Sequence, residues 1–200
     1  NNLFTKLPEV LGQCPKLEMV GFKANQISHV PSNSLPETLR WLILTDNKIA
    51  ELPDSLGNKP RLQKLALAGN QLTSLPKTVN QLNALELIRL SANALAEFPK
   101  QLLELPRLAW IAFSGNPFCQ REKEFETVPH VSFEDLQLNQ VLGQGASGVI
   151  SHADWKNASL NLPKEVAVKI FKGEITSDGY PEDELQACLQ AGTHDNLIKS

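Results

Sequence analysis

Leucine and asparagine recur in a fixed frame through the first 118 residues of this 200-residue chain. Segments 62–72 and 85–95 place leucine or another aliphatic residue at alternate positions just before each asparagine. Such alternation predicts a short strand with one buried face. Repetition at a fixed period predicts a stack of equivalent coils. The asparagines follow one another at intervals of 22, 23, 23 and 23 residues, as Asn25, Asn47, Asn70, Asn93 and Asn116.

The rest of each coil predicts a turn followed by a short helix. An apolar residue followed by proline comes between successive asparagines, as Leu52-Pro53, Leu75-Pro76 and Phe98-Pro99. Because proline fixes its own backbone angle and favours turns, we expect short helices over 77–82 and 100–105, on the side opposite the strands. In the strands the leucines point into a shared core, and each asparagine satisfies backbone groups of neighbouring coils. A stack needs about three coils, so this part is expected to fold without a disulfide.

The frame L-x-x-L-x-L-x-x-N-x-L resembles that of leucine-rich repeat proteins, in the form with Leu-Pro turns known from cytosolic and bacterial proteins. The resemblance implies an α/β solenoid over residues 1–118, with strands on a concave side and short helices on a convex side. The coils lack the cysteine-rich caps found on many secreted repeat domains.

Strand positions that do not face the core form a concave strip, which follows from the frame. They carry two tryptophans, several aliphatic residues and three cations, without a carboxylate. Exposed aromatic and arginine side chains are typical anchors of protein interfaces. We therefore predict a protein partner on this strip, bound mainly by Trp41, Lys64, Arg89 and Trp110; the alternative is a solvated surface with scattered apolar residues. The strip comprises Met19, Gly21, Lys23, Trp41, Ile43, Thr45, Lys64, Ala66, Ala68, Leu87, Arg89, Ser91, Trp110, Ala112 and Ser114.

Residues 119–130 are predicted to form a linker. The chain loses the repeat at residue 117 and becomes charged up to residue 130. A stretch of this length and polarity cannot cross a membrane, and no other window reaches the eighteen or so apolar residues that a span requires. We therefore expect no membrane span, and we expect the two flanking parts to share one compartment.

A second pattern begins at residue 131. Residues 133–142 alternate, and residues 149–155 are rich in β-branched and aromatic side chains, which predicts a strand on each side of a glycine turn. The turn carries the spacing G-x-G-x-x-G. Dinucleotide-binding folds share this spacing, but there the glycines lead from a strand into a helix. Between two strands, glycines instead let backbone amides approach phosphate groups closely.

A nucleotide held by such a hairpin requires a fixed cation. Lys169 lies 21 positions after Gly148, on a further strand-like run. A buried lysine is costly without a carboxylate partner. Glu184 is the candidate partner, on a short helix predicted within residues 181–190. A turn at His194 then enters another predicted strand.

These features, in this order, resemble the N-terminal lobe of a eukaryotic-type protein kinase from about residue 131 to residue 200. The resemblance implies a partial α+β lobe, an antiparallel sheet plus one helix. It implies that the glycine hairpin covers the phosphates of ATP, that apolar residues line an adenine pocket, and that Lys169 and Glu184 act as a catalytic pair. Carried over in this way, the ATP-binding residues are Leu142, Gly143, Gly145, Ala146, Ser147, Gly148, Val149, Ala167 and Lys169.

Both ends of the chain are expected to be cut. The single methionine, Met19, lies inside a repeat, and the chain ends before the part of a kinase that holds the catalytic base and the Mg²⁺ ligands. The resemblance therefore implies that Mg²⁺ is held by a following lobe and that this part alone transfers no phosphate. Ser147 stands where many kinases have an aromatic residue.

Composition narrows the remaining classes. With 42% hydrophobic and 20% charged residues, the chain is typical of soluble globular proteins. Residues 1–116 carry a formal charge of +3 and residues 117–200 carry −6, without a dense basic run, so nucleic acid is not an expected partner. The three cysteines are scattered, which predicts reduced thiols and, with ATP use, a cytoplasmic protein. The four histidines are isolated in sequence and predict no metal site.

Two main hypotheses follow. The first is an ATP-dependent protein kinase, expected to act on Ser or Thr, whose repeats recruit a substrate or regulator. The second is a pseudokinase or repeat scaffold without phosphate transfer, against which the intact glycines, Lys169 and Glu184 argue. A third reading is a repeat adaptor whose acidic second part folds back on the basic concave strip.

Overall fold

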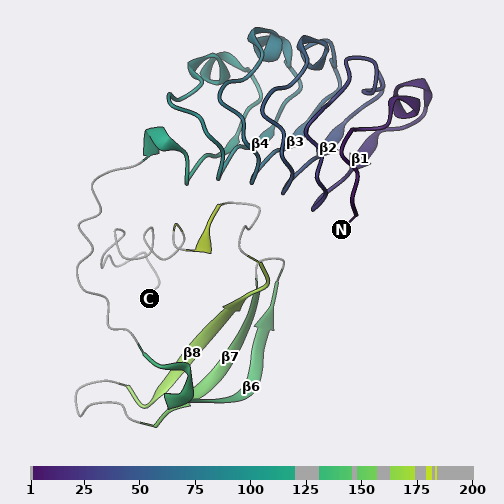
Figure 1. Ribbon diagram of the computed structural model, residues 1–200. Helices are drawn as coiled ribbons and strands as arrows, with labels where there is room; N and C mark the ends of the chain where they lie inside the picture. Colours follow the sequence, from purple (N-terminus) through teal and green to yellow (C-terminus); the bar gives the residue numbers. More distant parts are fainter. Residues whose placement is uncertain are drawn as a thin grey trace. The chain divides into compact units, whose positions relative to one another are not determined.

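The computed structural model describes residues 2–119, 131–145, 148–156, 163–173, 179–181 and 183. The chain divides into two compact units, residues 1–120 with 175–200 and residues 121–174. One unit contains a five-stranded sheet and the other a three-stranded sheet (Figure 1). The predicted domain limits at residues 118 and 131 stay a prediction.

The repeats form a parallel sheet with one three-residue strand per coil. Neighbouring strands in the sheet are also neighbours in sequence, in the order β1-β2-β3-β4-β5. In Figure 1 the labelled strands β1 to β4 lie side by side along one edge of the stack. The strands are β1 Met19–Gly21, β2 Trp41–Ile43, β3 Lys64–Ala66, β4 Leu87–Arg89 and β5 Trp110–Ala112.

The central residue of each strand points into the core, as the leucine frame predicts. Leu42, Leu65 and Ile88 are fully buried, and they belong to one continuous apolar cluster with leucines from the turns and helices of every coil. Parallel strands this short cannot stand alone, because each coil buries its apolar edge only against the next one. The stack therefore owes its stability to this shared core.

Short 3-10 helices lie along the edge opposite the strands (Figure 1). The segments predicted as helices at 77–82 and 100–105 form them over most of their length, which confirms the prediction. Each of these helices directly follows a proline, whose fixed backbone angle suits a helix start. The helices of this edge are η1 Glu9–Gln13, η2 Asp54–Leu56, η3 Lys77–Gln81 and η4 Lys100–Glu104; η5 Pro117–Cys119 follows the last strand at the end of the stack.

The recurring asparagines bond across coils, and this confirms the predicted ladder. The Asn70 Oδ1 atom accepts a 3.0 Å hydrogen bond from the Ile49 amide of the preceding coil. Its Nδ2 atom donates to the carbonyls of Leu44 and Leu67, each at 3.0 Å. Equivalent bonds recur at the asparagines of the flanking coils. Each buried side chain thereby ties two coils together.

The second unit is an antiparallel sheet in the order β6-β7-β8. Its strands are β6 Leu136–Gln144, β7 Gly148–Trp155 and β8 Glu165–Phe171, preceded by the 3-10 helix η6 Phe133–Asp135. The predicted pair of strands around a glycine turn is confirmed, and so is a strand around Lys169. Glu184, His194 and residues 120–130 of the predicted linker at 119–130 lie outside the described residues, while Cys119 belongs to helix η5. Within the part of the chain that the structure describes, no helix has the length and apolar character of a membrane span.

Candidate functional site

The register of the parallel sheet arranges the predicted concave residues in two rows. The first row, named the high row here, runs through directly paired positions of all five strands: Met19, Trp41, Lys64, Leu87 and Trp110. The second row, named the low row, consists of Gly21, Ile43, Ala66, Arg89 and Ala112. All five members of the high row have long side chains, whereas three members of the low row are glycine or alanine. The concave surface is therefore uneven, with its bulk in one line.

The high row combines exposed apolar side chains with a cation. Met19 and Trp110 expose 50% and 55% of their surface near the two ends of the row. Trp41 and Lys64 are half-buried, and the Lys64 Nζ atom lies 4.0 Å from the centroid of the Trp41 ring. A cation over an aromatic face is attracted by the ring and holds it in place. The cation at the centre of the row, Lys64, therefore packs on the ring of its neighbour Trp41.

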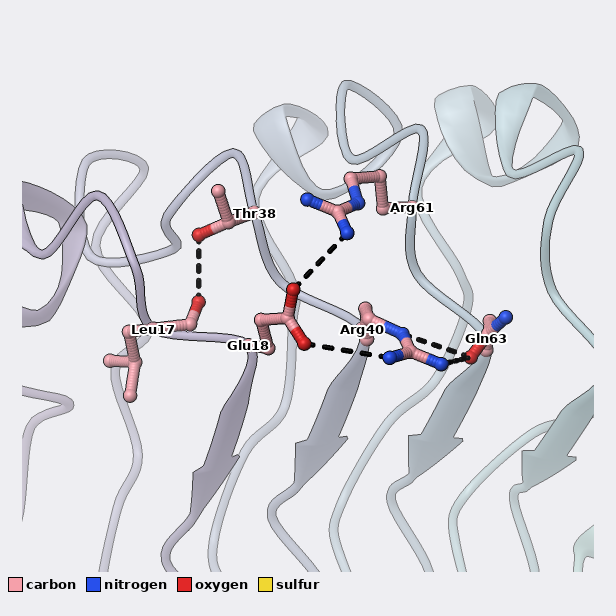
Figure 2. Close-up of polar contacts among 6 residues, drawn as sticks. All are labelled: Leu17, Glu18, Thr38, Arg40, Arg61 and Gln63. Carbon is pink, nitrogen blue, oxygen red and sulfur yellow. Dashed lines mark hydrogen bonds and ion pairs between the residues drawn. The ribbon is translucent and has the colours of Figure 1, made fainter.

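A polar network borders the high row, at the residue before each of the first three strands (Figure 2). The carboxylate of Glu18 accepts from Arg40 at 3.5 Å and from Arg61 at 3.1 Å, and Arg40 also donates to Gln63 Oε1 at 2.9 Å. The Thr38 hydroxyl donates to the Leu17 carbonyl at 2.8 Å beside it. Exposed ion pairs stabilise little, but this set fixes where the Arg40 side chain lies.

The border and the high row together line a small open pocket of about 190 Å³, formed by Glu18, Met19, Arg40 and Trp41. Its two apolar members belong to the high row. Glu18 and Arg40 were not predicted as site residues, because they precede the strands and fall outside the alternating frame. Their signal in the sequence is a carboxylate and a cation at matching positions of consecutive coils.

The structure brings the predicted partner-binding residues together only in part. Trp41, Lys64 and Trp110 share the high row, while Arg89 lies in the low row. Four residues of the predicted strip are buried and do not form exposed surface: Thr45, Ala66, Ala68 and Ser91. The predicted strip is thus narrower than the frame suggests.

In the three-stranded sheet, the register separates the residues predicted to bind ATP. Lys169 pairs with Ile150 and Ala167 with His152, so these four side chains share one face. Val149 pairs with Ile170 and points to the other face. Ile150, which was not among the predicted residues, therefore shares a face with Lys169, whereas Val149 does not. In the glycine motif of the kinases that the sequence resembles, an aliphatic residue stands two positions after the third glycine, and this was the available signal.

Leu142 lies at an irregular point of β6. Val141 pairs with Ser151 and Gly143 pairs with Ile150, so Leu142 is an extra residue on its strand, as in a β-bulge. Its side chain is 55% exposed. A bulge re-aims side chains next to a turn, and this one precedes the glycine hairpin.

The three glycines of the hairpin differ in why they are glycine. A Cβ atom at Gly148 would lie 2.5 Å from the carbonyl oxygen of Ile170, so the packing of β7 against β8 requires glycine there. At Gly143 and Gly145 an added Cβ would meet no other described atom within 4 Å. Both have ordinary negative φ angles, since neither is among the glycines with positive φ. The sheet itself therefore does not demand glycine at these two positions.

Two lysines lie near this hairpin. Lys169 Nζ is 4.7 Å from the centroid of the Phe171 ring. Lys172, which was not predicted, donates from Nζ to the Gly145 carbonyl at 3.1 Å. The amide of Gly145 donates to the Gly148 carbonyl at 2.9 Å and closes the turn. Ala146, Ser147 and Glu184 lie outside the described residues, so the predicted Lys169–Glu184 pair stays a prediction.

His152 differs from the prediction that the histidines are isolated. Its ring and the carboxylates of Asp154 and Glu165 each offer a ligand atom within 4.8 Å of the others. His152 Nε2 lies 3.5 Å from Glu165 Oε2, and the Asn139 amide nitrogen lies 2.8 Å from Asp154 Oδ2 and 3.2 Å from His152 Nδ1. Hydrogen bonds from Asn139 and the pairing with Glu165 account for this cluster without an ion.

Comparison with known proteins bears on the repeats. Residues 37–95 and 60–118 match the model of the leucine rich repeat family. A leucine-rich repeat protein of Leptospira interrogans is 33% identical, with a TM-score of 0.55 over 58% of this chain; the match spans 30% of that protein's chain. No curated protein matches the sequence.

Two plant receptors are also similar in structure. The leucine-rich repeat ectodomain of a receptor kinase from Arabidopsis thaliana is 22% identical, with a TM-score of 0.49 over 58% of this chain and 68% of that one. A plant peptide hormone receptor is 28% identical, with a TM-score of 0.42 over 56% of this chain and 22% of that one. The matched region of the family model, residues 37–118, consists of leucine-rich repeats, as the asparagine ladder and the parallel strands already indicate.

Proposed function

We propose that the repeats bind a protein partner through the high row. The observation that carries this proposal is the single register line of Met19, Trp41, Lys64, Leu87 and Trp110, which places two exposed apolar ends around a cation. Interfaces draw most of their binding energy from a few aromatic and cationic anchors surrounded by less important contacts. Exposed apolar side chains that form a contiguous line are more typical of a binding surface than of a solvated one.

Selection from a library of random twelve-residue peptides tests this proposal. The bait is the full chain, and the counter-bait is the same chain with Trp41→Ala and Trp110→Ala. We expect selected peptides to bind the unchanged chain at least about tenfold more tightly, since each anchor contributes roughly 1–2 kcal/mol. Leu103→Ala, a loss of an exposed apolar side chain on helix η4, is the matched control. Peptides that bind both baits equally would place the contact elsewhere and refute the proposal.

For the second unit we propose binding of the phosphates of ATP, as part of a protein kinase that acts on Ser or Thr. The supporting observation is that Gly143 and Gly145 leave open space which the sheet does not use. Backbone without side chains on one side of a turn suits the close approach of a phosphate. Ile150, Ala167 and Lys169 share one face of the sheet, which fits an adenine pocket that leads to the phosphate-holding lysine.

The proposed reaction is transfer of the γ-phosphate to a hydroxyl group in the cytoplasm, with Mg²⁺ and the catalytic base held by residues of the full protein that follow this part. A pseudokinase or repeat scaffold is the alternative. A pseudokinase can bind ATP without transferring its phosphate. A nucleotide-binding assay therefore tests the ATP site, and autophosphorylation of the full-length protein distinguishes a kinase from a pseudokinase. Lys169→Met is expected to abolish autophosphorylation, and retained activity would refute the kinase assignment.

A comparison of glycine variants tests the ATP site itself. Gly145→Ala is expected to change the free energy of unfolding, measured by thermal melting, by less than about 0.5 kcal/mol. It should weaken binding of a fluorescent ATP analogue at least about tenfold. Gly148→Ala is the contrasting variant, expected to destabilise the sheet by roughly 1–3 kcal/mol because its Cβ would meet the Ile170 carbonyl. Unchanged nucleotide affinity in Gly145→Ala would contradict the proposed phosphate contact.

A further inference from the structure

A short segment that follows the three-stranded sheet in sequence packs against the last two coils of the repeats. Its described residues, 179–181 and 183, belong to the same compact unit as the repeats. Gly179 is buried. A Cβ atom added to Gly179 would lie 3.4 Å from the Ser91 Cβ atom and 3.5 Å from the Ser114 Cβ atom, so a single methyl group would already touch both coils. Each of these serines comes two positions after the low-row residue of its strand.

The ring of Tyr180 lies on the backbone of the last coil. A Cβ atom at Gly115 would lie 2.8 Å from the Tyr180 Cδ2 atom and 3.0 Å from the Asp183 Oδ2 atom. Both distances are shorter than ordinary contacts between such atoms. The Tyr180 ring and the Asp183 carboxylate thus occupy the space that a side chain at position 115 would need.

The turn alone does not explain why position 115 is glycine. The residue before each ladder asparagine has a positive φ angle, and in three of the five coils this residue is not glycine. The five residues are Ala24 (53°), Asp46 (60°), Gly69 (68°), Ala92 (52°) and Gly115 (75°). Alanine and aspartate therefore fit the left-handed backbone of this turn. The Tyr180 ring supplies a reason for glycine in the last coil that the turn itself does not.

Asp183 fixes the shape of the segment that lies on the repeats. Its Oδ2 atom accepts a 3.0 Å hydrogen bond from the Tyr180 amide, and its own amide donates to the Tyr180 carbonyl at 3.0 Å. A side chain that accepts from the amide three residues earlier is one half of a capping box at a helix start. Burial raises the pKa of the Cys119 thiol, a backbone hydrogen bond from Asn116 lowers it, and the Asp183 carboxylate raises it again. Asp183 thus acts on the end of the stack as well as on its own segment.

We propose that the last two coils of the repeats are a docking site for residues 179–183 of the same chain. The segment leads directly into Glu184 in the sequence. Docking therefore restricts where Glu184 can lie, since its Cα atom is about 3.8 Å from that of Asp183. The repeats then have two binding roles, a partner protein on the high row and the chain's own segment at the end of the concave side. Docking requires neither a nucleotide nor a partner protein, so its test is independent of both proposed functions.

Disulfide trapping in the full chain tests the docking site, with the three native cysteines replaced by serine. Ser114→Cys with Gly179→Cys places two Cβ atoms 3.5 Å apart, a separation that a disulfide accepts. The control pair is Lys23→Cys with Gly179→Cys, because Lys23 has the equivalent position in the first coil, four strand spacings or roughly 19 Å from Ser114. Under mild oxidation the Ser114 pair should link within one chain at least about tenfold faster than the control pair. Equal rates, or links formed only between two chains, would overturn the inference.

A wedge at position 115 tests the same contact from the side of the repeats. Gly115→Asn retains a residue that tolerates positive φ and places a side chain where the Tyr180 ring lies. It should slow trapping of the Ser114–Gly179 cysteine pair several fold. Ala24→Asn is the matched control, since Ala24 is also half-buried and has the same turn position in the first coil, and it should leave the rate unchanged. Equal trapping rates in the two variants would contradict the docking of Tyr180 on Gly115.

A photochemical link provides a second measurement that leaves position 179 unchanged. Gly179 has a φ angle of 134°, which side chains rarely adopt, so Gly179→Cys is the variant most at risk of not folding. If circular dichroism shows that it does not fold, Tyr180 is replaced by the photoreactive residue p-benzoylphenylalanine. Irradiation should link this residue to the peptide that contains Ser114 and Gly115, as identified by mass spectrometry. Links confined to other peptides of the chain would overturn the docking site.

Discussion

The two sheets of this protein are stabilised in opposite ways. In the repeats, every strand places its central aliphatic residue in one continuous core, and the turns and helices add further buried leucines. In the three-stranded sheet, the buried residues among those described are Gly148, Ser151 and Ala153, while Val141 and Leu142 expose 61% and 55% of their surface. Similar apolar content thus produces a closed core in one unit and exposed apolar faces in the other.

The difference shows what repetition contributes. A strand of three residues is far too short to be stable alone, but each coil presents the same edge to its neighbours and the core grows by addition. The longer strands of the second sheet have better hydrogen-bonded ladders but no layer of described residues packed over them. Three strands require a covered apolar face for independent stability. Substitution of a core leucine in the repeats should therefore cost more unfolding free energy than substitution of a leucine in the second sheet.

The largest expected effect tests this contrast directly. Leu65→Ala removes a fully buried side chain from the middle of the stack and should cost roughly 2–5 kcal/mol of unfolding free energy, through lost burial and a residual cavity. Leu142→Ala, at an exposed leucine of the second sheet, should cost under about 0.5 kcal/mol. Urea denaturation followed by circular dichroism measures both. Comparable losses in the two variants would show that the second sheet has a core of its own.

The asparagine ladder sharpens the comparison within the repeats. Asn70→Leu leaves the Ile49 amide and the carbonyls of Leu44 and Leu67 without their buried partner, which should cost about 1–3 kcal/mol. Asn83→Leu is the control, because Asn83 is exposed at the end of a convex turn and should change stability by less than about 0.5 kcal/mol. Thermal melting distinguishes them, and an unchanged curve for Asn70→Leu would contradict the role of the ladder.

The smallest expected effect concerns a buried charge in the repeats. Lys59 is 7% exposed, and loss of hydration lowers its pKa, with Glu37 acting in the opposite direction. The unfolded chain therefore binds this proton more tightly, so the ammonium costs stability at neutral pH, and the cost shrinks as pH rises from the lowered pKa towards the ordinary value of 10.5. Lys59→Met should stabilise the repeats at pH 7 by less than about 1 kcal/mol, with the gain fading in melts at higher pH. A gain that grows with pH would contradict this.

The repeats were well predicted because one sequence frame determines the role of each position in a coil. The core positions, the asparagine contacts and the two rows of the concave side follow from counting within one coil. Counting could not show that Thr45, Ala66, Ala68 and Ser91 are buried, because burial depends on side chains from other segments. It also missed Glu18 and Arg40, whose contacts join residues 22 positions apart through side chains alone.

Prediction of the second unit was limited by register. The hairpin and the Lys169 strand follow from alternation, but β6 has irregularities on both sides of Val141, and pairing then decides which residues share a face. The pairing of β7 with β8 is regular, and it places Ile150 and not Val149 beside Lys169. The bond from Lys172 to Gly145 joins residues 27 positions apart, and no local pattern of the sequence indicates it.

The in-register high row has a consequence for how this surface can evolve. Each coil contributes one side chain to the row, and consecutive members are one strand spacing apart. Duplication of a single coil would lengthen the row by about 4.8 Å, the reach of one or two residues of an extended partner, and leave the existing contacts in place. Under the proposed function, partner binding on this surface could therefore change in discrete increments, with one additional coil lengthening the bound segment without redesign of the rest.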